Sequence, residues 1–218
     1  MKLYDYVLSP SCYKVRLLGS LLDVPLELLP VDFHPGREHK MPELLALNPA
    51  GSIPILVDEH LVLTESAAIL AYLAAHHGPN WLAVNDPAAI GQQQQWLAFS
   101  HRLTRALGGA RLVEMLHFDG DLATLQVDGV TALRELEAAL FAKRLHGSTF
   151  IAGDTPTIAD IACFPYVALA PDGSISLDPY PSIRIWMRAI RALPGFIEMP
   201  GIHRLHELAP DPFTEASK

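Results

Sequence analysis

The sequence is poor in cysteine and in charge, and it has no long apolar run. Its two cysteines, Cys12 and Cys163, are too few for a disulfide framework, so we expect a protein of a reducing cytoplasm. The 16 basic residues are outnumbered by 24 acidic residues, and the net charge of −8 disfavours nucleic acid as a partner. The most apolar stretches, such as 67–75, fall far short of the ~18–20 residues of a membrane span. Residues 1–5 start no signal-peptide pattern, so we expect no secretion.

The chain has enough apolar residues for a substantial core. Half of its 218 residues are hydrophobic, which suits one large domain or two compact ones. In residues 1–77 the hydrophobic pattern predicts, in order, a strand at 3–8, a helix from Ser9, a strand at 26–31, a short helix at 41–47, a hairpin within 53–63 and a helix at 67–77. This order predicts a small α/β layer with a mixed sheet.

The remainder of the chain is helical in character. Residues 78–87 are expected to form a linker, and residues 88–218 an all-helical domain. We expect helices at 88–107, at 130–145, after the capping box at Thr157, from Tyr180 onward and at 194–206, with Gly108-Gly109 kinking or breaking the first of them. His203 and His206 stand beside Glu207 without a third ligand, so no metal site is expected.

The stretch from Asn48 to Ser66 contains two signals for ligand binding. Pro54 stands where a strand begins, and a cis Ile53–Pro54 bond would leave the main chain of Ile53 free to pair with a peptide-like ligand. Glu65-Ser66 then opens a helix, whose free N–H groups and positive dipole end suit a carboxylate. Taken singly, these signals also fit an ordinary proline-started strand and an ordinary helix cap.

In this order and spacing, NPxGxIPxL followed by an E-S pair resembles the cytosolic glutathione S-transferases, and in particular their bacterial, serine-type members. The resemblance covers residues 1–77, and the PTIAD capping box resembles the family's C-terminal domain. It implies a thioredoxin-like domain followed by an all-helical domain. It also implies that Ile53 and Pro54 pair with the cysteinyl backbone of glutathione and that Glu65 and Ser66 hold its γ-glutamyl end.

Two further groups of residues take roles from the same resemblance. His39 and Lys40 are similar to residues that contact the glycyl carboxylate, and the alternative is a solvated loop. Ser52 stands where some relatives carry a glutamine that touches the ligand, which leaves its own contact open. Ala67 replaces an arginine of some classes, so the class within the family stays open.

Ser9 is the candidate catalytic residue. The segment Ser9–Arg16 resembles the family's active-site segment, in which the residue that activates the thiol lies six positions before a V-R pair. Ser9 could also serve only as a helix N-cap, and Ser11 is the spare hydroxyl. Cys12, in the first helical turn, is either a packing residue or a redox-active thiol.

The resemblance implies a glutathione transferase. Glutathione would be the co-substrate, its thiolate would attack a small hydrophobic electrophile, and the enzyme would be a homodimer. The alternatives are a glutathione-dependent isomerase or dehalogenase of the same fold, and a non-catalytic glutathione-binding regulator. The electrophile is expected between the domains, against the helix at 96–107 and the segment after Ser9.

Overall fold

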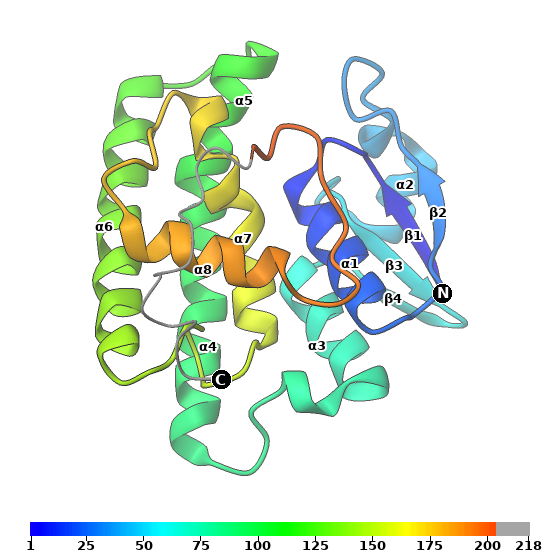
Figure 1. Cartoon of the computed structure of the whole chain (residues 1–218). Helices are drawn as coiled ribbons and strands as arrows, with labels where there is room; N and C mark the ends of the chain where they lie inside the picture. The colour runs from blue at the N-terminus through cyan, green and yellow to red at the C-terminus, as the bar shows by residue number, and fades with distance from the viewer. Residues whose placement is uncertain (204–218) are drawn as a thin grey trace.

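The first part of the chain forms a four-stranded mixed sheet with three helices. The computed structural model describes residues 1–203. The elements are β1 (Lys2–Asp5), α1 (Pro10–Leu21), β2 (Glu27–Pro30), α2 (Pro42–Leu47), β3 (Ile55–Asp58), β4 (Leu61–Leu63) and α3 (Ser66–His77). The strand order is β2-β1-β3-β4, with β1 parallel to β2 and antiparallel to β3, while β3 and β4 form a hairpin (Figure 1). The α/β layer predicted from the hydrophobic pattern is confirmed.

Alternation along the strands gives the sheet two buried faces. On one face Leu3 and Leu56 join the main core, while on the other Ile55 packs with Val31 and with Leu44 of α2. Successive residues of a strand point to opposite faces, so the neighbours Ile55 and Leu56 belong to different clusters. The sheet is therefore covered on both sides.

The second part of the chain is built of helices. They are α4 (Pro87–Leu103), a π-helical turn (Thr104–Gly108), α5 (Gly109–Leu116), α6 (Leu122–Leu145), α7 (Ile158–Ala168) and α8 (Pro181–Arg191). All residues of α7 are buried, and α7 packs against α4 and also against α1 and α3 (Figure 1). The main core therefore runs without a break from the sheet to the helices, which fixes the surfaces between them.

α7 begins with the predicted capping box. The Thr157 hydroxyl accepts the Ala159 N–H, and Asp160 Oδ2 accepts the Thr157 N–H at 2.9 Å. Asp160 Oδ1 also accepts the Ile151 N–H and the Trp186 indole N–H, at 3.0 and 2.9 Å. One carboxylate, 0% exposed, thus connects α7 to the preceding loop and to α8.

Two predicted boundaries differ in the structure. β1 ends at Asp5 rather than residue 8, because a turn follows in which the Ser9 N–H donates to the Tyr6 carbonyl. α6 begins at Leu122, eight residues before the predicted start, with Asp121 as its N-cap. Leu122 and Leu125 of these first turns pack against the main core, but Gln126, Asp128 and Gly129 interrupt the apolar pattern before Val130.

One further prediction concerns the pair Gly108-Gly109. Gly108-Gly109 does not break the helix, which continues through the π turn into α5. A Cβ added at Gly108 would stand 2.6 Å from the Tyr166 ring, so glycine at this position permits close helix packing.

The helix expected at 194–206 is wrong over 194–203, where the chain is irregular. The rest of that prediction, residues 204–206, lies outside the described part of the chain. Two carbonyls of the segment 194–203 accept hydrogen bonds from α1 instead. The Gly195 carbonyl accepts from the Ser20 hydroxyl, and the Ile197 carbonyl accepts from the Tyr13 hydroxyl.

Candidate functional site

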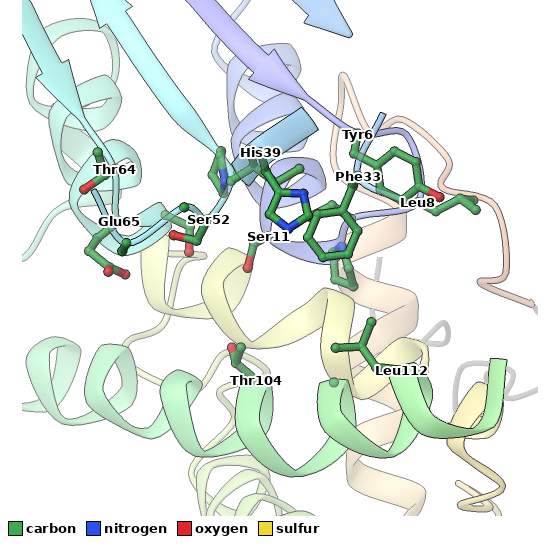
Figure 2. A pocket seen from close by; sticks show the side chains of 18 of the residues that line it. Tyr6, Leu8, Ser11, Phe33, His39, Ser52, Thr64, Glu65, Thr104 and Leu112 are labelled. Atoms are coloured by element: carbon green, nitrogen blue, oxygen red, sulfur yellow. The ribbon is translucent and has the colours of Figure 1, made fainter. Parts of the chain in front are cut away.

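A cavity of about 520 Å³ lies between the sheet part and the helical part of the chain. All nine residues predicted for the site line it: Ser9, Ser11, His39, Lys40, Ser52, Ile53, Pro54, Glu65 and Ser66. Figure 2 shows Ser11, His39 and Glu65 on the sheet side, with Thr104 and Leu112 facing them from the helical side. The structure therefore brings the predicted residues to one place, and their individual roles stay predictions.

Ser9 is the N-cap of α1. Its backbone is extended, with φ −83° and ψ 117°, and its Oγ accepts the Cys12 N–H at 3.2 Å. The hydroxyl also hydrogen-bonds the Cys12 side chain, which acts to lower the pKa of that thiol against the larger effect of burial. Because burial keeps the thiol protonated, the hydroxyl can turn its hydrogen to a ligand at the positive end of the twelve-residue helix.

Two arginines hold the loop that precedes Ser9. Arg16 Nη2 donates to the Val7 carbonyl at 3.0 Å, and its Nη1 is paired with Asp5 at 3.1 Å. Arg111 Nη1, from α5, donates to the Leu8 carbonyl at 3.0 Å. The position of Ser9 is thus set from both parts of the chain.

Ser11 has its hydroxyl engaged. Ser11 Oγ lies 2.8 Å from the Tyr166 hydroxyl of α7, and either oxygen can be the donor. Burial raises the pKa of Tyr166, so its phenol stays protonated at neutral pH. Ser11 can donate to a ligand only when the Tyr166 hydroxyl is the donor of this bond.

Cys12 lies under this surface and not in the cavity lining. Its side chain is 0% exposed, and burial raises the pKa of its thiol to about 12. A thiol of this kind carries almost no thiolate at neutral pH. The packing interpretation fits Cys12, and the redox interpretation has no chemical support.

Lys14 is buried beneath the same turn of α1. It is 2% exposed, its Nζ lies 4.7 Å from the centre of the Tyr166 ring, and burial lowers its pKa to about 8. The cysteine at position 163 and the acidic Glu65 act in the opposite direction and favour the charged amine. Lys14 thus stays largely protonated at pH 7 at a cost in stability.

Replacing Lys14 with Met is expected to stabilise the protein by about 3 kcal/mol at pH 7. The unfolded amine has a pKa near 10.5, above the folded value of about 8, so the unfolded chain binds more protons between these values. The contribution of Lys14 to stability therefore rises with pH across this window, and the advantage of the variant should vanish above it. Urea unfolding at about pH 7 and about pH 10.5 measures the difference, with exposed Lys2→Met as the control. A variant less stable than the wild type at pH 7 would contradict the expectation.

The Ile53–Pro54 bond is cis. The β1–β3 ladder begins at Ile55, so Ile53 lies beyond its end and at the cavity. Asn48, 3% exposed, braces the preceding loop, because its amide donates to the Ser52 carbonyl at 2.7 Å and its Oδ1 accepts the Ala50 N–H at 3.1 Å. The conformation that the sequence left open is the one that can present main chain to a ligand.

His39 and Lys40 form a 3₁₀ turn at one end of the cavity. The His39 ring is stacked on Phe33 at 4.2 Å, and its Nδ1 is buried with no hydrogen-bond partner. Burial lowers the pKa of His39, and the charges of Lys40 and Arg37 act in the same direction, so His39 is neutral at pH 7. Lys40 Nζ donates to the Ala50 carbonyl at 3.1 Å, which ties the turn to the loop before Pro54.

Glu65 and Ser66 stand at the start of α3. Glu65 is the N-cap, and its exposed side chain makes no capping hydrogen bond, so its carboxylate is free to bind a cation. The first N–H groups of α3, from Ser66 onward, face a carboxylate favourably. This pair can therefore hold an amino-acid end, with amine at Glu65 and carboxylate at the helix.

Sequence reasoning missed most of the helical side of the cavity. Of the helix at 96–107, Thr104 lines the cavity, and Arg111, Leu112 and Leu116 follow in α5. The other newly found lining residues are Tyr6, Leu8, Pro10, Phe33, Ala50, Gly51, Thr64, Gly108 and Tyr166. The spacing Leu103, Leu107, Arg111 contains a signal for Arg111, since it puts a cation in line with buried residues.

The described chain shows neither a metal-binding cluster nor a membrane-spanning helix. Within residues 1–203 no three His, Cys, Asp or Glu residues are grouped to hold a metal ion, while His206 and Glu207 lie outside that range. No helix in the described chain combines the length and apolarity needed to cross a membrane.

Two family models match the chain. They describe the N-terminal domain of glutathione S-transferase, over residues 1–75, and the C-terminal domain of glutathione S-transferase, over residues 125–194.

Individual relatives match almost end to end. The chain is 32% identical to glutathione S-transferase 3 of Zea mays, covering 90% of this chain and 91% of the relative. It is 30% identical to the maleylacetoacetate isomerase of Pseudomonas aeruginosa, covering 90% and 93%. Among solved structures, a possible glutathione S-transferase from Rhodopseudomonas palustris superimposes with a TM-score of 0.80 at 31% identity, covering 96% of this chain and 98% of the other.

Proposed function

The chain belongs to the glutathione S-transferase family, and from this premise we propose that Ser9 is the residue that activates the glutathione thiol. The protein is a glutathione transferase with the fold of that family, and glutathione is its co-substrate. Its reaction requires the thiol of glutathione to ionise before the sulfur attacks an electrophile.

One hydrogen bond is enough for this activation. A free thiol has a pKa near ~8.5, so only a few per cent is thiolate at neutral pH. A hydrogen bond to a charged group is worth roughly 1.5–3 kcal/mol, which lowers the pKa by about one to two units. The N-terminus of α1 acts in the same direction.

The observation that supports the proposal is the position of the Ser9 hydroxyl, which lines the cavity at the N-terminus of α1. Its Oγ accepts the Cys12 N–H at 3.2 Å, and its hydrogen can turn to a sulfur in the cavity. Ser11 shares its hydroxyl with Tyr166. Ser11 is therefore assigned to the binding surface and not to activation.

The remaining site residues would hold the tripeptide. The main chain at Ile53 and Pro54 pairs with the cysteinyl backbone, Glu65 binds the γ-glutamyl amine, and Ser66 binds its carboxylate. At the other end, neutral His39 and charged Lys40 donate to the glycyl carboxylate. The Asn48 amide donates to both the Ser52 carbonyl at 2.7 Å and the Ser52 Oγ at 3.0 Å, so Ser52 keeps its hydroxyl hydrogen as a donor for the ligand.

The domain division, the binding place of the electrophile, the oligomeric state and the localisation belong to the same proposal. We assign residues 1–77 to the glutathione-binding domain, 78–87 to a linker and 88–218 to the helical domain. The electrophile is a small molecule bound against Thr104, Leu112 and Leu116, and the active form is a cytoplasmic homodimer. The gap between α3, which ends at His77, and α4, which begins at Pro87, supports the domain division.

The test is an ultraviolet titration of glutathione bound to the enzyme. The thiol pKa of bound glutathione is expected one to two units below that of free glutathione. The control is S-methylglutathione, which cannot ionise and should give no thiolate absorbance. Binding with an unshifted thiol pKa would favour the non-catalytic regulator over the transferase.

A second candidate reaction is glutathione-dependent isomerisation. Relatives from Pseudomonas aeruginosa and Caenorhabditis elegans, the latter named as probable, are maleylacetoacetate isomerases, at 30% and 28% identity. Addition of the thiolate followed by its elimination uses the same activated sulfur and restores glutathione. Turnover without net consumption of glutathione would identify this reaction, and release of halide would identify a dehalogenase.

A further inference from the structure

The helical side of the cavity carries one charged side chain. Its lining residues there are Thr104, Gly108, Arg111, Leu112, Leu116 and Tyr166, and of these described residues only Arg111 is ionised at neutral pH. Burying this cation is costly, and the Asp172 carboxylate at 2.8 Å is its charged partner in the described chain.

The guanidinium of Arg111 is held rigidly. It is 7% exposed, Nε donates to Asp172 Oδ2 at 2.8 Å, and Nη1 donates to the Leu8 carbonyl at 3.0 Å. Within residues 1–203 Nη2 has no hydrogen-bond partner. Arg111 thus lines the cavity with a fixed group and a spare donor, an arrangement suited to an anionic ligand.

Arg111 is bonded to the loop that leads into Ser9. The carbonyl that Arg111 holds belongs to Leu8, the residue immediately before Ser9. A ligand bound to both Arg111 and the thiolate at Ser9 must therefore carry its anionic group within a few bonds of its electrophilic carbon. Part of the lining is apolar, with Leu112 opposite the Phe33 and Tyr6 rings, whose centres are 5.6 Å apart (Figure 2).

We propose that Arg111 forms a carboxylate subsite and that the enzyme prefers small unsaturated carboxylic acids with an apolar body. This inference rests on the proposed function of Ser9. Asp172 offsets part of the Arg111 charge, so the preference for the acid is expected near the lower end for a charge-assisted contact, about tenfold.

The reaction of such an acid can be written for 3-benzoylacrylate. The thiolate sulfur forms a bond to the carbon that carries the carboxylate, and the π pair of the double bond moves to the ketone as an enolate. Water then supplies the proton to the adjacent carbon. No oxidant or reductant is needed, and the carboxylate at Arg111 stays unchanged.

The test compares 3-benzoylacrylate with its methyl ester, each rate corrected for the uncatalysed addition of glutathione. The wild-type enzyme is expected to favour the acid about tenfold in kcat/KM relative to the uncatalysed ratio. Arg111→Gln should abolish this preference, and Arg111→Lys should retain part of it. The exposed pair of Arg102 with Glu135 supplies the control, since Arg102→Gln should leave the acid-to-ester ratio unchanged.

The acid-to-ester ratio of kcat/KM separates a carboxylate-binding role of Arg111 from a purely structural role. Loss of the Leu8 contact alone would lower acid and ester rates by the same factor, so an unchanged ratio in Arg111→Gln overturns the proposal. Should that variant not fold, wild-type inhibition by 3-benzoylpropionate and its methyl ester gives the same comparison, and equal inhibition constants overturn it. Conjugation of the ester without preference for the acid refutes this inference alone, whereas absence of both reactions with an unshifted thiol pKa refutes the proposed function.

Discussion

Replacing Ser9 with Ala is expected to lower kcat for glutathione conjugation by roughly 10- to 100-fold and to raise the pKa of the bound thiol by about one to two units. The hydroxyl donates to the sulfur only once the sulfur is charged, so its loss affects the thiolate far more than the bound thiol. Affinity for glutathione should therefore change little. Steady-state kinetics and the thiol titration measure both quantities.

Two serines of the same helix serve as controls for Ser9→Ala. Ser20 donates to the Gly195 carbonyl away from the cavity, so Ser20→Ala should leave kcat unchanged. Ser11→Ala should reduce kcat less than Ser9→Ala, because the Ser11 hydroxyl is shared with Tyr166. Full activity in Ser9→Ala, or a larger loss in Ser11→Ala, would transfer the role from Ser9.

Replacing Asp160 with Ala should destabilise the protein by about 3–5 kcal/mol. The change leaves the Ile151 N–H, the Thr157 N–H and the Trp186 indole N–H without their acceptor in a fully buried place. For a chain of this size the loss corresponds to a fall of roughly 6–20 °C in the midpoint of thermal unfolding. Differential scanning calorimetry measures the fall.

Asp121 provides a matched control for Asp160. It also accepts hydrogen bonds at a helix start, from the Thr124 N–H at 3.1 Å and the Thr124 hydroxyl at 2.6 Å, but it is exposed. Asp121→Ala should cost much less than Asp160→Ala, because water can replace the hydrogen bonds of an exposed cap. Equal losses in the two variants would show that burial of the Asp160 network adds nothing.

The sheet side of the site could be predicted because its signals are local. The turn at Asn48, the proline at the start of β3 and the pair Glu65-Ser66 lie within nineteen positions, and backbone rules govern each of them. The N-cap at Ser9 is equally local. The hydrogen bond between the Ser11 and Tyr166 hydroxyls was not predictable, since the two residues are 155 positions apart in the sequence.

The helical side could not be predicted for the same reason. Arg111 reaches Leu8 across 103 positions, and that contact depends on how α5 is set by the π turn before it. Gly108 suggested a helix break, but its missing side chain makes room for Tyr166. A helix was expected at 194–206, whereas the Ser20 and Tyr13 hydroxyls donate to the Gly195 and Ile197 carbonyls and the described part of this segment is irregular.

Arg16 and Arg111 donate hydrogen bonds to the consecutive carbonyls of Val7 and Leu8, Arg16 from the sheet part of the chain and Arg111 from the helical part. With the roles proposed for Ser9 and Pro54, reactivity and tripeptide recognition are separable properties of this enzyme. We expect substitutions along α5 to change how the nucleophile is aligned without touching the loop at Pro54, so that new electrophiles are accommodated while the co-substrate is held as before.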